Sequence, residues 1–270
     1  MGSDFENDPL FGPAAPDLGW VPAPRYLLRR ARVLPLLKAA STGRLLEIGP
    51  GSGSLLIEAA LLGFQCEALE LSTQARELAE KLSARAGTAI AVRAESSADW
   101  HQRFDVLCAF DVLEHIEDDR ATLAQWRSWL KPGGTLLLSV PAHMRLWSAG
   151  DEWAGHYRRY EREELQALLT QAGFALDRFE CYGFPMSNLG ERISAPIYAR
   201  RIHQSSGDMQ DDRRINNDRS GTDRAPHLKL FPILQSTIGR WGMRLAFATQ
   251  HIFIHSDLGS GYIAMAKRPR

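Results

Sequence analysis

The segment best suited to chemistry in this sequence is a short glycine-rich run with an acid in front of it, EIGPGSG at 47–53. An apolar run, Arg44–Ile48, leads into it, and a helical pattern begins at Ser54. Glycines at such a junction allow tight turns and let a ligand approach the backbone closely. The N-terminus of the following helix offers unpaired N–H groups. The segment therefore predicts a binding site for a small ligand with an anionic end.

A second acid, Glu70, lies about 20 residues further on, at the end of the next apolar run. A carboxylate at this place in a strand–helix–strand unit can accept hydrogen bonds from both hydroxyls of a ribose. An exposed acid at a strand end is the structural alternative. The nicotinamide fingerprint G-x-G-x-x-G/A does not fit, because Ser54 occupies its third small position.

Three histidines are candidates for a general base, since an imidazole with a pKa of about 6.5 can accept a proton at neutral pH. His156 ranks first, because its loop follows the fifth predicted strand and also carries Trp153 and Tyr157 as apolar walls. His143 ranks second, because it follows the same strand at the carboxyl edge of the sheet, where open α/β folds bind ligands. His115 is the third candidate. For His115 and His156 a purely structural role is the alternative.

The spacing of Asp111, Glu114 and His115 leaves two interpretations open. At i, i+3 and i+4, the three side chains would share one face of a helical turn. Such a set could bind a hard divalent metal ion or form a hydrogen-bond network, and we assign no metal ligands. The three cysteines, at 66, 108 and 181, fall inside predicted strands, where packing is their expected role.

The elements that must hold these residues alternate along the chain. Strands are predicted at 44–48, 64–71, 88–93, 104–110, 135–140, 174–182 and 261–266. Helices are predicted at 54–62, 73–85, 119–130 and 162–172, with another from Arg25 that Pro35 should kink or split. Strands that alternate with helices favour a mostly parallel, doubly wound α/β sheet.

The domain boundaries follow from composition. Residues 1–24 hold five prolines among acids and glycines and are expected to form a mobile or draped arm. The core should span 25–183, with its final strand in 259–270. Between them, 184–258 should form a helical insertion or lid, with helices at 187–202 and 233–254 and a disordered loop at about 203–227. The second of these helices is apolar enough to cover the pocket, form a dimer or lie on a bilayer.

Together these motifs resemble those of class I S-adenosylmethionine-dependent methyltransferases, in the broad group (methyltransferase type 11/12) that includes quinone and small-molecule O-methyltransferases. The resemblance rests on E-x-G-x-G-x-G at 47–53, FDVLCAFDVLEHI at 104–116 and KPGG at 131–134. It covers about 25–182 and the last strand. It implies a seven-stranded Rossmann-like sheet of order 3-2-1-4-5-7-6 with an antiparallel last strand. The helical insertion before that strand departs from the minimal pattern.

The same resemblance implies how the cofactor, S-adenosylmethionine, is bound. The glycine loop would wrap its amino-acid end, Glu70 would hold its ribose, and Glu95 or Ser96 would meet its adenine. No Asn-Pro-Pro-Tyr-like motif follows the fourth predicted strand, which argues against methylation of DNA bases. The residues expected at the cofactor are Glu47, Gly49, Gly51, Gly53, Glu70, Leu71, Glu95, Ser96, Phe110 and Asp111.

The amino-acid composition argues against some classes of binding partner. The 270 residues carry 32 basic and 32 acidic side chains, and a net charge of zero argues against a nucleic-acid partner. No apolar run of about 18 residues and no signal peptide is found, so we expect a cytoplasmic protein. The expected function is in-line methyl transfer to a hydroxyl or other heteroatom of a small molecule. The alternatives are a membrane-associated or lipid- or quinone-directed methyltransferase, or a non-catalytic cofactor-binding scaffold; a homodimer also stays open.

Overall fold

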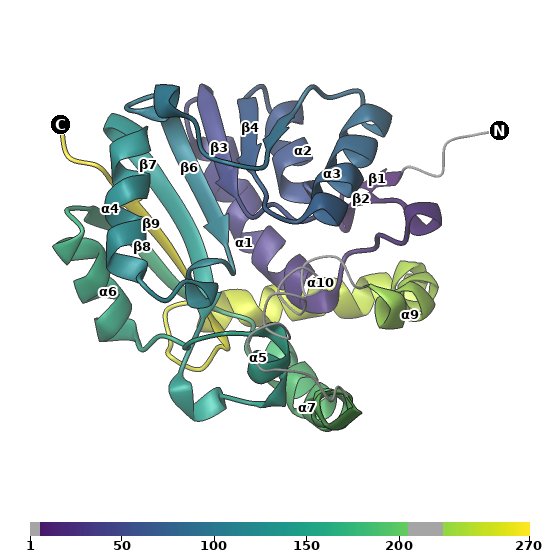
Figure 1. The fold of residues 1–270 in the computed structure, drawn as a ribbon. Coiled ribbons are helices and arrows are strands. Elements are labelled where there is room, and N and C mark those ends of the chain that lie inside the picture. The colour runs from purple at the N-terminus through teal and green to yellow at the C-terminus, as the bar shows by residue number, and fades with distance from the viewer. Residues whose placement is uncertain (1–5, 205–223) are drawn as a thin grey trace.

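The computed structural model describes residues 6–204 and 224–270. Its centre is a seven-stranded sheet with helices on both faces (Figure 1). The strands, in spatial order, are β5 (Ala91–Arg93), β4 (Gln65–Leu69), β3 (Arg44–Ile48), β6 (Phe104–Phe110), β7 (Leu130–Pro141), β9 (Gly261–Lys267) and β8 (Ala175–Tyr182). β9 runs antiparallel to both of its neighbours. The predicted order and the antiparallel last strand are therefore confirmed.

The helices are α1 (Pro24–Ala39), α2 (Ser54–Leu61), α3 (Thr73–Arg85), α4 (Asp119–Trp129), α5 (Ala149–Ala154), α6 (Arg162–Gln171), α7 (Met186–Gln204), α9 (Ala225–Gln235) and α10 (Thr237–Phe253). Alternate residues of the central strands face two separate apolar clusters. Leu45 lies in a cluster with Leu55 of α2, whereas Leu46 lies in a cluster with Leu123 of α4. The first cluster also contains side chains of α1 and α10, and the second those of α6.

The sheet has a switch point beside β3. β4 and β5 lie on one side of this strand, and β6 and the later strands lie on the other. β3 and β6 run parallel with Ile48 opposite Ala109, so their carboxyl ends meet at the same edge. The glycine loop and the segment after Phe110 therefore emerge side by side, at the position where open α/β sheets bind ligands.

The N-terminal segment, expected to be a mobile or draped arm over 1–24, lies against the body over residues 6–24. Residues 6–14 form a hairpin of β1 (Glu6–Asp8) and β2 (Gly12–Ala14). Phe11, Trp20 and Val21 are buried. The ring of Phe11 packs edge-on against Phe231, with centroids 5.7 Å apart. Residues 6–24 are therefore packed against the body through buried apolar side chains, although the composition of this segment is rich in proline.

The insertion before β9 differs in detail from the prediction. The helix expected over 233–254 is two helices, because Ser236 begins α10 by accepting a hydrogen bond from the Gly239 N–H at 3.2 Å.

Other expectations about the helices can be compared with the structure. Pro35 lies inside α1 without splitting it. The loop expected at 203–227 falls largely outside the described residues; its ends belong to α7 and α9. Of the helices that are described, none is both long and apolar enough to span a bilayer.

Candidate active site

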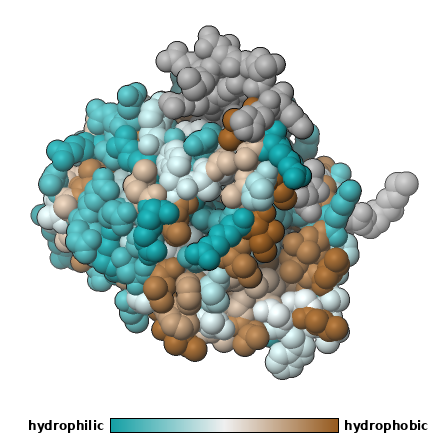
Figure 2. All heavy atoms as spheres, turned by 90° about the horizontal axis from the view of Figure 1, so that it is seen from below, coloured by the Kyte–Doolittle hydropathy of each residue, from teal (hydrophilic) through white to brown (hydrophobic). Residues whose placement is uncertain are grey.

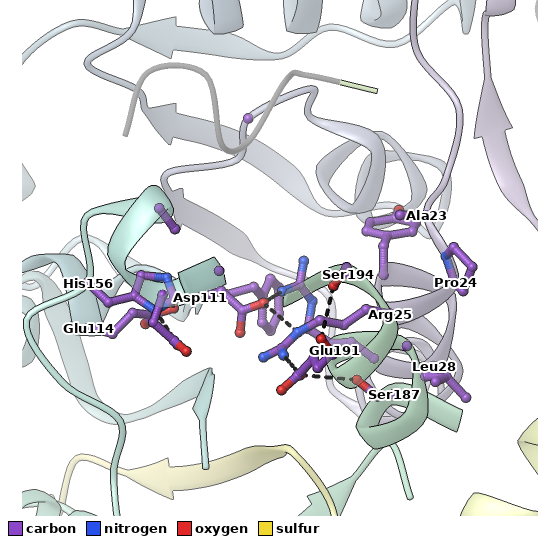
Figure 3. A pocket seen from close by; sticks show the side chains of 18 of the residues that line it. Ala23, Pro24, Arg25, Leu28, Asp111, Glu114, His156, Ser187, Glu191 and Ser194 are labelled. Carbon is purple, nitrogen blue, oxygen red and sulfur yellow. Dashed lines mark hydrogen bonds and ion pairs between the residues drawn. The ribbon is translucent and has the colours of Figure 1, made fainter. Parts of the chain in front are cut away.

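A cavity of about 440 Å³ opens where the carboxyl ends of β3 and β6 meet. Its wall combines the glycine loop and the segment after β6 with side chains from α1, α5 and α7 (Figure 3). Among the residues predicted to bind the cofactor, those that line it are Glu47, Gly49, Gly51, Phe110 and Asp111. His115 and His156 line the same cavity, so the structure brings the two predicted functions together.

The glycine loop takes a backbone path that L side chains rarely adopt. Gly49, Gly51 and Gly53 have φ values of +61°, +56° and +72°. A Cβ on Gly49 would lie 2.8 Å from Cγ2 of Val112. Gly53 lies outside the cavity lining and makes the turn into α2, so its contribution is the turn itself.

Two acids frame the loop in different ways. Glu47 is buried in the cavity wall, and burial raises its pKa to about 8, although Arg29 opposes the shift. Glu70 accepts hydrogen bonds from the Gly51 N–H at 3.0 Å and the Ser72 N–H at 2.9 Å. Its carboxylate thus ties the loop to the end of β4. Leu71, Glu95 and Ser96 are exposed and do not contribute to the cavity lining.

Two arginines of α1 reach Asp111 from across the cavity. Arg29 forms an ion pair with Asp111 and lies over the ring of Phe110, 5.5 Å from its centroid. Arg25 lies between Asp111 and Glu191 and pairs with both (Figure 3). Burial alone would raise the pKa of Asp111, but the two guanidinium groups lower it to about 2. Sequence analysis missed these cations; their i, i+4 spacing on the first helix was the available signal.

His156 is held by a buried acid. Its Nδ1 lies 2.9 Å from Oδ1 of Asp151. Arg159 donates from Nε to the same oxygen at 2.7 Å and from Nη2 to Oδ2 at 2.8 Å. Burial would raise the pKa of Asp151, but hydrogen bonds from His156 and Arg159 lower it below its usual range. An ionised Asp151 favours the proton on Nδ1, which leaves Nε2 as the acceptor. This is the arrangement of a general base and the group that orients it.

Glu114 and His115 lie beside this pair and are short of partners. Glu114 is fully buried, and neither of its carboxyl oxygens has a hydrogen-bond partner among the described residues. Burial, helped by the charge of Asp111, raises its pKa well above the usual range. Burial and His156 lower the pKa of His115 to about 3, so its ring is neutral. The two histidine rings meet edge-on, 4.6 Å apart.

The metal-ligating set differs from the one considered in the sequence. Donor atoms of Glu114, His115 and His156 lie within 4.8 Å of one another and could hold a cation. Asp111 is not part of this set; it faces the arginines and accepts a hydrogen bond from the Ser139 hydroxyl at 2.9 Å. The chain turns sharply after β6, with Asp111 at φ +55°, which separates it from the turn that carries Glu114 and His115.

His143, the second candidate base, lies outside the cavity lining. The chain turns at this residue with φ +64°, and its buried ring packs against Tyr262 of β9 at 5.4 Å. Its Nδ1 lies 3.1 Å from Oε2 of Glu161, and its Nε2 lies 3.8 Å from Asp257. His143 therefore braces the end of β7 and does not face the glycine loop.

Comparison with known proteins places this geometry in a family. A model of the family described as "Methyltransferase domain" matches residues 23–178. A ubiquinone biosynthesis O-methyltransferase of Xanthomonas euvesicatoria pv. vesicatoria is 32% identical over 151 residues, which cover 50% of this chain and 63% of the relative. One from Cereibacter sphaeroides is 34% identical over 146 residues, or 48% and 59% of the two chains. The match thus spans less than two thirds of these relatives.

Solved structures share the fold at low identity. Phosphoethanolamine N-methyltransferase 2 of Haemonchus contortus has a TM-score of 0.54 at 20% identity, covering 90% of this chain and 52% of the other. The [4+2]-cyclase SpnF has a TM-score of 0.55 at 18% identity, covering 91% and 82%. Because one of these is a cyclase, the fold alone does not assign the reaction. The family match extends over more than half of the sequence, and the chain belongs to the class I S-adenosylmethionine-dependent methyltransferases.

Proposed function

We propose that the protein transfers a methyl group from S-adenosylmethionine to a hydroxyl of a small, partly apolar acceptor. The observation that carries the proposal is His156, which Asp151 orients inside the same cavity as the glycine loop. The O-methyltransferase names of the relatives support the same reaction type. A net charge of zero supports a small molecule over a nucleic acid.

The cavity residues fit the cofactor. Nε of Arg29 is buried without a hydrogen-bond partner in the described chain, which suits a ligand carboxylate. Glu47 and Asp111 line the same space, and the positive charge of an ammonium group would lower the raised pKa of Glu47 and favour its carboxylate. Glu70 lies outside the cavity lining and binds the Gly51 N–H, so its proposed contact with ribose hydroxyls rests on its place at the end of β4. When bound, S-adenosylmethionine supplies an electrophilic methyl group on a sulfonium.

The chain's own part in the reaction is to orient the acceptor and remove its proton. Nε2 of His156 accepts the hydroxyl proton, while Asp151 keeps Nδ1 protonated and stabilises the imidazolium that forms. Burial and the charge of Asp111 raise the pKa of Glu114 well above its usual range, which disfavours a second negative charge beside Nε2. Trp153 and Tyr198, with ring centroids 4.9 Å apart, form an apolar wall that suits an aromatic acceptor.

His156→Gln tests the proposal. Glutamine can orient a hydroxyl but cannot accept its proton, so turnover should fall about 10²- to 10⁴-fold. Affinity for S-adenosylhomocysteine, measured by calorimetry, should stay level. Turnover is followed by mass spectrometry on a panel of phenols and catechols. Wild-type turnover in the variant would show that His156 is not the base; no methylated product from any acceptor would favour a cofactor-binding scaffold.

We also propose a cytoplasmic location. All three cysteines, at 66, 108 and 181, are buried free thiols, as expected in a reducing compartment.

A further inference from the structure

The helices before the last strand carry an apolar surface that no described part of the chain covers. On α10 the exposed side chains recur on one face, at Ile238, Trp241, Leu245 and Ile252, with exposures of 86%, 66%, 68% and 75%. Ile233 of α9 adds to them. We call these five residues the apolar ridge. Figure 2 shows apolar side chains gathered on the lower part of the face that it displays.

The apolar ridge does not belong to the face of α10 that packs against the body. The opposite face of this helix, with Met243, Ala246 and Gln250, is the one buried against the body. Gln250 anchors it, donating a hydrogen bond to the Leu28 carbonyl at 3.0 Å. An ordinary surface helix is polar on its outer face. α10 is apolar on both faces, and an exposed apolar patch of this kind marks an interaction surface.

The charges beside the ridge are positive, although the whole chain is neutral. α9 and α10 contain no acidic residue, whereas they carry Lys229, Arg240 and Arg244. Arg240 is paired with Asp8, at 2.6 Å. Lys229 and Arg244 are exposed, and the guanidinium carbon of Arg244 lies 5.8 Å from the ring centroid of Trp241. An apolar ridge that contains tryptophan and is flanked by cations suits the interface of a negatively charged bilayer.

We propose that α9 and α10 bind the surface of an anionic lipid bilayer through the apolar ridge. A second copy of the chain fits the same surface less well. A two-fold contact through the ridge would bring Arg244 and Lys229 of both copies together, and like charges across an interface disfavour association. The inference is independent of the proposed reaction, because it concerns only the outer face of the insertion.

Flotation with lipid vesicles tests the proposal on the full chain. The protein should float with vesicles of phosphatidylcholine and phosphatidylglycerol, and much less with phosphatidylcholine alone. Trp241→Ser combined with Leu245→Ser should weaken binding about tenfold or more. Arg244→Gln should weaken binding to the anionic vesicles about fivefold. Leu61→Ser, at an exposed leucine of α2 outside the ridge, is the matched control and should float like the wild type.

Calorimetry with S-adenosylhomocysteine should show that each variant keeps its cavity. The proposal is overturned if the wild-type protein does not float with anionic vesicles, or if the double variant floats as well as the control. It is equally overturned if sedimentation shows a dimer that only the double variant dissociates, because the ridge would then be an interface between copies.

Discussion

Single residues in the cavity differ sharply in their charge, although they lie close together. Asp111 is ionised because Arg29 and Arg25 face it, whereas Glu114, three residues later, is driven toward its neutral form by burial and by Asp111 itself. Neighbouring acids with such opposed pKa shifts are common where a protein handles protons. The ionised carboxylate of Asp111 faces the arginines of α1, and the carboxyl group with the raised pKa lies beside His156.

Glu114→Gln should change how stability depends on pH. The folded pKa of Glu114 lies above its unfolded value of about 4.3, so the folded protein keeps a proton that the unfolded chain releases. The stability from this group is fully present below a pH of about 4.3, and the wild type loses it as the pH rises above that value, by at most about 1.4 kcal/mol per pH unit. The glutamine variant lacks that loss. Urea unfolding of the ligand-free proteins measures it.

Glu117→Gln, at an exposed acid of the same segment, is the control; it keeps Glu114 and should lose stability with rising pH as the wild type does. A constant difference between Glu114→Gln and the wild type across this range would mean that Glu114 is ionised in the folded protein.

Asp151→Asn should separate orientation of the base from cofactor binding. Without the carboxylate, Nδ1 of His156 loses its charged partner and the imidazolium loses its stabilisation, so turnover should drop about 10²- to 10⁴-fold. The affinity for S-adenosylhomocysteine should hold within about twofold. Asp99→Asn, at an exposed acid paired with Arg103, is the control and should leave both unchanged. Full turnover in Asp151→Asn would assign Asp151 to structure alone.

The sequence pointed to the residues that follow a strand directly and missed those that fold back from elsewhere. Glu47 and Asp111 could be placed because each belongs to an apolar run or comes directly after one. Glu191 could not be placed, since it comes from α7, and no periodicity tells where that helix returns to the cavity. His143 was placed after the right strand, but a positive φ turned it away. The pattern of residue types does not predict a backbone turn of this kind.

At the scale of elements, the position of the glycine loop depends on the pairing of β3 with β6. The loop and the turn after β6 then touch, and Gly49 has room only for a hydrogen atom beside Val112. The sequence predicted these strands well, because buried parallel strands are continuous apolar runs. It predicted the insertion less well. A serine cap at Ser236 divides one apolar stretch into α9 and α10, and composition does not register such a cap.

Gly49→Ala should therefore affect the ligand more than the fold. Both Gly49→Ala and the control Gly87→Ala place a side chain at positive φ, which costs about 1–2 kcal/mol of stability. Gly87 has no atom within 4 Å of the added Cβ, whereas Gly49 has Val112 at 2.8 Å. Displacing the loop should weaken binding of S-adenosylhomocysteine about tenfold to a hundredfold in Gly49→Ala only. Equal affinity in the two variants would show that the loop does not contact the cofactor.

At the scale of the whole molecule, segments distant in sequence pack around the central seven-stranded sheet. Residues 6–24 lie against the body, and α7 reaches the cavity from the insertion. The sequence predicted the sheet order through its resemblance to a family, but it left open whether the N-terminal segment is mobile or draped on the body. Burial of Phe11 depends on Phe231, more than 200 residues away, and a local reading of composition cannot detect that contact.

The change in melting temperature on addition of a ligand tests the assignment of the protein to the methyltransferases. A ligand that binds only the folded state stabilises it by mass action, so S-adenosylmethionine and S-adenosylhomocysteine should both raise Tm. At a concentration of 100 times Kd, the gain is about 2.7 kcal/mol. NAD is the matched control, because it also carries adenosine but requires a different loop, and it should leave Tm unchanged. Equal stabilisation by NAD would contradict the family's cofactor in this protein.

Glu191 pairs with both Arg25 and Arg159. Arg159 is also the arginine that holds Asp151, so ion pairs connect Arg25 through Glu191 and Arg159 to Asp151. A substitution at Glu191 is therefore expected to change the pairing of Arg25 and of Arg159 together, and its effect should not stay at one end of the cavity.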